Sequence, residues 1–385
     1  MNRALFKLVC SAVAVVAMGT QAFAQAPKQD KDKCPAAAFQ QGDDGLMMNQ
    51  FPAAYNTPGS IATKGGWDVF FDASFIYWHA DQDNMDLAYG GAQNASSAAE
   101  ATAPVSSQVL FQDVSYKPGF KVGFGFNTDY DGWVGNVEYT WLHQTTTTSA
   151  NAPATATASG TGAGVWVPND WFAATGAVIQ ASQINSSWKL QMDMIDASMS
   201  RPFYQGRQLT ILPYAGLRSL FLRQALRINA TNVFNTAMPA YSSENISQSW
   251  SIGPNAGMNA HWIVGSGFRF EGFAGASILY TRYTKIAHDE HNQVAAGSAT
   301  SPFVGRVTQL GTLRPVMDAG LGLGWGTYFS NQAYHFDLLA RYDFMVAWSQ
   351  NVMRQLTNLY TPDSVGAPAG DLHLHGLTLS ARFDF

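Results

Sequence analysis

YKPGFKVGFGFN, residues 116–127, alternates large apolar residues with small or polar ones. One face carries Tyr116, Pro118, Phe120, Val122, Phe124 and Phe126, and the other carries Lys117, Gly119, Lys121, Gly123, Gly125 and Asn127. A period of two is that of a β-strand, and about 9 to 11 residues carry a tilted strand across a bilayer. The stretch therefore predicts a membrane-crossing strand with one face toward lipid and the other toward a wet lumen.

The same alternation recurs from Trp67 to the C-terminus. Apolar sets that we expect to face lipid include Trp133, Val137, Tyr139 and Trp141; Trp188, Leu190, Met192 and Met194; Leu217 and Phe221; Trp250, Ile252 and Met258; Phe268 and Phe270; Leu313, Leu321 and Leu323; and Tyr342 and Phe344. A soluble β-sandwich also alternates. These segments, however, exceed the length of about 5 or 6 residues that is commonest in globular strands, which favours a transmembrane barrel.

Short and long connections alternate between the predicted strands. Short turns are expected at 127–132, 205–207, 264–266 and 330–332, and long loops at 80–108, 145–184, 228–246, 287–307 and 351–370. Outer-membrane barrels have short periplasmic turns and long extracellular loops. The count gives an all-β, antiparallel up-and-down barrel of about ten strands over residues 66–385, or twelve if loop 145–184 hides two more.

The N-terminus has the features of an export signal. Arg3 and Lys7 precede an apolar run over residues 8–18 and the small-x-small site at Ala22 to Ala24. This pattern predicts a signal peptide over residues 1–24, too short to span a bilayer as a helix. Residues 25–65 show no sustained period, which indicates a periplasmic leader. Cys34 is then the one remaining thiol, either an intermolecular bridge or an inert group.

Charge and composition limit the partners. Without Arg3 and Lys7, 20 basic residues face 27 acidic ones, a balance of about −7 that argues against nucleic acid. Charged residues make up only 13% of the chain, against roughly 25% in soluble domains. The C-terminal pattern Leu377, Leu379, Ala381, Phe383 and Phe385 has the form of a signal for the barrel-assembly machinery. We therefore predict a multi-pass protein of the Gram-negative outer membrane in contact with its lipid.

Several short motifs resemble one family. PGFKVG at 118–123, PYAGLR at 213–218, WSQN at 348–351 and GLT at 376–378 are similar to the Legionella-type major outer membrane proteins, a family that includes pore-forming proteins of Chlamydia-like bacteria. The resemblance extends over residues 66–385. It implies a porin-like diffusion pore for small hydrophilic solutes, and it supplies no binding residues.

Charged residues on the polar faces are the candidate functional groups. They are Arg218, Arg269, Glu271, Arg314, Asp318, Asp337, Arg341 and Asp343. A ring of such charges would set ion selectivity. The alternative is that they pair with one another and fill a narrow lumen, as happens in barrels near eight strands. A closed structural or adhesive barrel is accordingly the alternative function, and a homo-oligomer remains open.

Other motifs give little support for chemistry. The cluster His288 to His291 is read as a solvated loop, and His373 with His375 as an interfacial pair, so no metal site is predicted. There is no G-x-S-x-G elbow and no H-E-x-x-H motif, and we predict neither an enzyme nor a cofactor. The segment 165–172 is expected either to fold inward as a constriction or to pack over the barrel rim.

Overall fold

The computed structural model describes residues 61, 63–64, 68–91, 107–128, 132–152, 154–157, 160–172, 179–206, 208–232, 239–293, 304–356 and 369–385. All of them belong to one compact unit, Phe51–Phe385. The predicted signal peptide, the leader up to Ser60 and Cys34 lie outside the described residues. No helix among the described residues is long and apolar enough to span a membrane.

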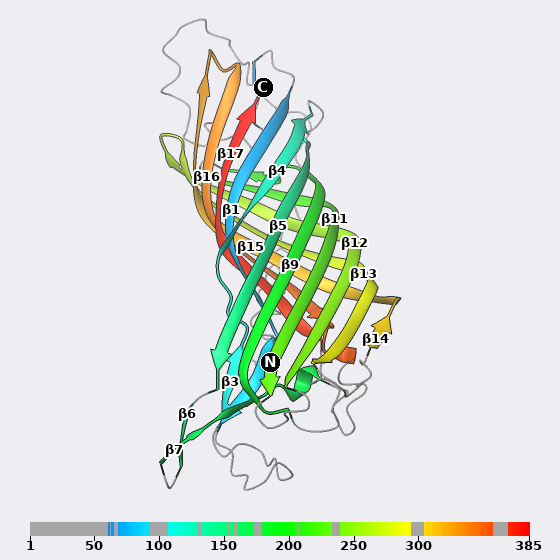
Figure 1. The fold of residues 1–385 in the computed structure, drawn as a ribbon. Coiled ribbons are helices and arrows are strands. Elements are labelled where there is room, and N and C mark those ends of the chain that lie inside the picture. The colour runs from blue at the N-terminus through cyan, green and yellow to red at the C-terminus, as the bar shows by residue number, and fades with distance from the viewer. Residues whose placement is uncertain are drawn as a thin grey trace, which may run out of the picture. The chain divides into compact units, whose positions relative to one another are not determined.

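Ten antiparallel strands close into a barrel, which confirms the predicted fold and strand number (Figure 1). In order around the barrel they are β1 (Val69–Gln82), β4 (Lys117–Asn127), β5 (Val134–Asn151), β9 (Ala181–Ser200), β11 (Leu209–Asn232), β12 (Ala240–Gly265), β13 (Phe268–Gln293), β15 (Leu310–Phe329), β16 (Tyr334–Asn351) and β17 (Gly370–Asp384). Each strand pairs with its neighbour in sequence order, and β17 returns to β1 from Phe70↔Asp384 to Gln82↔Leu372. Closure removes the free edges that a bilayer cannot hydrate.

Tight connections lie together at one end of the barrel. Ser266 and Gly267 join β12 to β13 with φ of 54° and 83°, the positive values that a primed hairpin turn requires. The C-terminal strand finishes at this short-turn end, where the Phe385 N–H donates to the Val69 carbonyl at 3.0 Å. The last leader residues reach the same end, because the Asn127 side chain donates to the Ile61 carbonyl at 3.0 Å.

The remaining elements lie in the connections. They are β2 (Asp86–Gly91), β3 (Ser107–Phe111), β6 (Ala154–Thr157), β7 (Gly160–Ala163), β8 (Val165–Val167), the short helix η3 (Asn169–Trp171), β10 (Tyr204–Gln205) and β14 (Val304–Val307). The hairpin β6–β7 pairs only with itself and adds no strand to the barrel, so the twelve-strand alternative is wrong.

The outer surface of the barrel is a lipid-facing apolar band. Phe75, Phe124, Leu313 and Leu321 are between 50% and 75% exposed, although they are large and apolar. A water-facing surface of this kind would be an aggregation hazard, whereas a bilayer solvates it. The lipid face predicted for residues 116–127 is therefore the observed one.

In β9 the predicted orientation is wrong. Trp188, Leu190 and Met192 are fully buried inside the barrel, and the exposed Lys189 points outward. Alternation identifies the two faces of a strand but not which of them meets lipid. The interior at this level is apolar, so the apolar side of β9 faces the lumen.

Several strands also run farther than predicted at the long-loop end. β11 continues to Asn232, β12 begins at Ala240 and β13 continues to Gln293, although loops were expected over 228–246 and 287–307. In β11 the alternation continues with its sense reversed, because Leu226, Ile228 and Ala230 are buried inside whereas Arg227 and Asn229 are exposed outside. The predicted loop boundaries were wrong for this reason.

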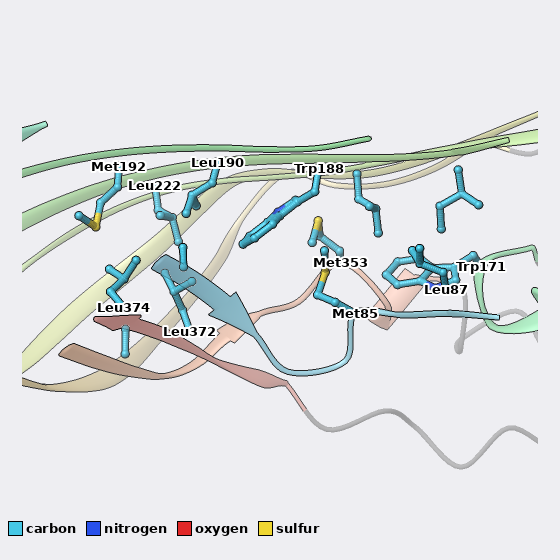
Figure 2. Close-up of a cluster of buried hydrophobic side chains, with 14 of the residues drawn as sticks. Met85, Leu87, Trp171, Trp188, Leu190, Met192, Leu222, Met353, Leu372 and Leu374 are labelled. Carbon is cyan, nitrogen blue, oxygen red and sulfur yellow. The ribbon is translucent and has the colours of Figure 1, made fainter. Parts of the chain in front are cut away.

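Buried apolar side chains fill the long-loop half of the barrel interior. Figure 2 shows Leu190 and Met192 of β9 opposite Leu372 and Leu374 of β17, with Met85 and Met353 close to Trp188. β9 and β17 are not neighbours in the barrel, so these side chains meet across the lumen. We call the long-loop half, which holds this layer together with buried polar side chains such as Asn245, His288 and Glu290, the apolar half, and the short-turn half the polar half.

Candidate functional site

The polar half of the lumen contains a cavity of about 330 Å³. Five Lys or Arg and seven Asp or Glu side chains line it: Lys121, Arg218, Arg269, Arg341 and Arg382, with Asp72, Glu138, Asp196, Glu271, Asp318, Asp337 and Asp343. Ile61, at the end of the leader, also lines it. Cations and anions are intermixed around the wall rather than separated onto opposite sides.

Arg218 joins strands that are not adjacent in the barrel. Its Nε lies 2.6 Å from Asp196 Oδ1 on β9, and its Nη1 lies 2.7 Å from Asp318 Oδ1 on β15. The Arg218 side chain is only 5% exposed. A guanidinium presents several fixed donors, so one arginine satisfies both carboxylates and ties opposite parts of the wall together.

A second group of ion pairs centres on Arg269 and Glu271. Arg269 donates to both Asp337 oxygens, at 2.5 and 2.9 Å, and to Glu271 at 3.0 Å. Arg341 lies 2.5 Å from Asp343 and 3.7 Å from Glu271. This arrangement leaves the buried charges paired, which limits the cost of removing them from water.

Arg314 differs from the other seven predicted lumen charges. Those seven line the cavity, whereas Arg314 lies in the long-loop half, 5.9 Å from the centre of the Tyr283 ring. The structure therefore brings seven of the candidates together and separates the eighth.

Sequence reasoning missed several cavity residues. Lys121 lies 3.3 Å from Glu138, and Arg382 lies 2.5 Å from Asp384, which also contacts His335 at 3.0 Å. The signal was present, because Lys121 and Glu138 occupy the polar faces of their alternating segments. Asp196 was missed because the alternation is irregular near 195–199.

A packed apolar layer lies on the long-loop side of this cavity. The packed layer includes Ile76, Leu142, Trp188, Leu190, Met192, Leu220, Leu222, Leu279, Val316 and Leu372, each no more than 3% exposed. A hydrophobic constriction repels water and ions even where some space remains.

Connecting segments cover this layer and form a cap, which we define as β2, β8, η3 and residues 352–356. Arg354 links it, since its guanidinium lies 2.7 Å from Asp86, also pairs with Asp170, and sits 5.5 Å from the centre of the Trp171 ring. Trp171 donates to the Asp86 carbonyl at 2.7 Å and is fully buried. Of the two arrangements considered for 165–172, the segment packs into the apolar interior.

Within the cap, burial together with Asp86 and Asp170 raises the pKa of Tyr89 to about 12. The phenol therefore stays protonated at neutral pH, and its hydroxyl donates to Asp86 at 3.1 Å. Tyr89 thus adds a neutral hydrogen bond to the carboxylates that bind Arg354.

Of the two histidine clusters, the one at His288 differs from its predicted setting. His288 is buried within β13, 2.6 Å from both Asn245 and Glu290, so it is not part of a solvated loop. His375 lies on the outer face, 2.7 Å from the Tyr342 hydroxyl. His373 lies near Asp83 and Asp371, with ligand atoms within 4.8 Å of one another. Exposed acidic groups commonly gather this way without a metal.

Phe383 and Phe385, the predicted assembly signal, lie at the short-turn end with ring centres 4.7 Å apart. Phe383 also packs against Tyr334 on β16. The position is that of an interfacial aromatic girdle. Recognition by the assembly machinery stays a prediction.

Residues 61–385 match the family described as the Legionella pneumophila major outer membrane protein precursor. The chain belongs to this family. Membership confirms the predicted resemblance and, together with the barrel, the outer-membrane location. No curated protein sequence matches the chain.

Three solved outer-membrane barrels show a distant likeness to this member of the Legionella pneumophila major outer membrane protein family. The outer membrane protease OmpT from Escherichia coli is 9% identical, with a TM-score of 0.39 over 85% of this chain and 100% of that one. A major outer membrane protein from Thermus thermophilus is 11% identical, with a TM-score of 0.28 over 81% and 99%. The Pseudomonas putida toluene transporter TodX is 8% identical, with a TM-score of 0.25 over 87% and 92%.

Proposed function

We propose that this outer-membrane protein is a structural barrel whose lumen is closed to solutes in the state described here. The main observation in support is that the apolar layer, which includes Trp188 and Leu372, packs across the long-loop half and is covered by the cap. Fully burying one large apolar side chain stabilises a protein by about 1.5–3 kcal/mol, so opening a layer of ten or more such side chains is costly. An adhesive role for the long loops belongs to the same closed-barrel class.

A porin-like channel for small hydrophilic solutes is the second candidate. The charged cavity in the short-turn half favours it, because a diffusion pore needs a wet lumen. The cap consists of connecting segments, and moving it would leave only the wall side chains in the way. On this alternative the cap is a gate, and the acidic excess of the cavity favours cations.

Single-channel recording in planar bilayers separates the two functions. The folded wild-type barrel is expected to give no reproducible conductance steps, and regular steps would overturn the closed-barrel proposal. The Arg354→Ala variant loosens the cap at its central ion pairs. Steps that appear only in this variant would establish the gated pore. A matched control is Arg306→Ala, which removes an exposed ion pair outside the cap.

We also propose that the chain is not an enzyme. Arg218, Arg269 and Arg341 form ion pairs with carboxylates of the cavity. A carboxylate held in such a pair is poorly placed to act as a general acid or base. Peptide and ester hydrolysis assays on the folded barrel test this proposal, and a rate above the heat-denatured control would contradict it.

A further inference from the structure

Cations gather on one side of the outer surface, away from the lumen. Among the described residues of the ten barrel strands, outward-facing Lys and Arg occur only on β9, β11 and β13, and β14 adds one more. They are Lys189, Arg223, Arg227, Arg282, Lys285 and Arg306. These strands lie side by side with β12 between them (Figure 1). We call these six residues the cationic face.

The strand register places the members of the cationic face close together. Arg223 is opposite Gln248, which in turn is opposite Lys285. Two strand spacings separate Arg223 from Lys285, about 10 Å at a spacing near 4.8 Å. Lys189 is opposite Ala225, one diagonal step from Arg223. Long side chains at such positions are close enough to contact the same ligand.

Within the part of the chain that the structure describes, four of the six cations have no carboxylate partner. Arg227 pairs with Glu244 at 2.9 Å, and Arg306 pairs with Asp289 at 3.2 Å. Among the described residues, no ion pair forms at Lys189, Arg223, Arg282 or Lys285. The outward carboxylate of β9, Asp193, is already engaged by the Tyr139 hydroxyl at 2.7 Å and by His143 at 3.2 Å. The surface therefore presents uncompensated positive charge on a chain that is acidic as a whole.

On the short-turn side of these cations, the same strands and the neighbouring β15 present apolar side chains to the outside. Phe221 lies two residues from Arg223, and Tyr280 lies two residues from Arg282. Ile278 and Leu313 continue the band and are 58% and 64% exposed. Positive charge at the long-loop edge of an apolar band is complementary to an amphiphile with an anionic head group and acyl chains.

The opposite side of the barrel shows a different pattern. At the same end, the outward positions of β16, β17 and β1 carry Tyr342, His375, His79 and Asp81, and no Lys or Arg. A general requirement for cations at the membrane interface would place them around the whole barrel. Their restriction to adjacent strands indicates a specific ligand.

We propose that the cationic face binds the phosphate groups of a phosphorylated, acylated lipid of the outer leaflet. Phosphate oxygens accept hydrogen bonds from Arg223 and Lys285, with Lys189 and Arg282 on either side, and the acyl chains lie against the band formed by Phe221, Ile278 and Tyr280. Long loops mark the external end of an outer-membrane barrel, which assigns this lipid to the outer leaflet.

Lipid titration of the folded barrel in detergent tests this proposal. The probes are fluorescent bisphosphorylated lipid A and the same lipid with both phosphates removed. We expect tighter binding of the phosphorylated form, weakened by salt. Each cation near a lipid surface contributes about a fivefold effect, so Arg223→Gln with Lys285→Gln lowers affinity about 25-fold. The dephosphorylated lipid should bind both proteins equally.

The control is Arg201→Gln, which removes an exposed cation at the short-turn end. It should change lipid affinity less than twofold, and heat-modifiable gel mobility verifies that each variant is folded. Equal binding of the two lipids to wild type would overturn the proposal, as would equal losses in Arg223→Gln and Arg201→Gln. Displacement of the lipid by millimolar inorganic pyrophosphate would identify a site for free anions instead, which also overturns it.

Discussion

Removal of Arg218 should destabilise the barrel more than removal of any exposed arginine. In Arg218→Met, Asp196 and Asp318 lose the guanidinium that binds both, while their side chains remain only 14% and 13% exposed. Breaking a buried ion pair by removing one partner costs about 3–5 kcal/mol, because the other charge stays unpaired in a poor solvent. We expect a loss of unfolding free energy in this range.

Urea titration of the barrel refolded into lipid vesicles, followed by tryptophan fluorescence, measures the loss. The matched control is Arg227→Met, whose ion pair with Glu244 lies on the outer surface with the arginine 65% exposed. Exposed pairs contribute about 0.2–1 kcal/mol. The triple variant with Asp196→Asn and Asp318→Asn should recover most of the stability. If Arg218→Met and Arg227→Met lose equal amounts, the ion pairs of the lumen do not act as a buried network.

Three further outcomes are expected. Trp188→Ala should lower the unfolding free energy by about 3–5 kcal/mol in the same titration, because it leaves a cavity in the apolar layer; a change below 1 kcal/mol would mean the layer is loosely packed. Arg354→Ala should make the cap sensitive to added protease while the barrel stays intact on a gel, and unchanged resistance would show that its ion pairs do not hold the cap. Gly267→Ala should slow refolding, because the new Cβ would lie 2.4 Å from the Gly326 carbonyl oxygen at φ of 83°; wild-type kinetics would contradict this.

Sequence patterns were sufficient for the barrel and for most of the lumen charges. Alternation over segments such as 116–127, with short and long connections between them, follows from the requirement that a membrane-spanning sheet satisfy its backbone and present lipid on one side. Arg218, Arg269, Glu271 and Asp337 could be assigned to the polar face because that requirement acts on each strand independently.

Tertiary structure alone decided which face of β9 is buried and what lies inside the long-loop half. Alternation in β9 separates an apolar face from a polar face but does not say which of them faces the lumen. Only contacts with strands distant in sequence, such as β17, reveal that Trp188 and Leu190 point inward. In the cap, Arg354 binds Asp86, 268 positions away, and in the lumen Arg218 binds Asp318, 100 positions away. Local periodicity reports the solvent on each side of one strand, whereas closure of the lumen depends on which strands face one another across it.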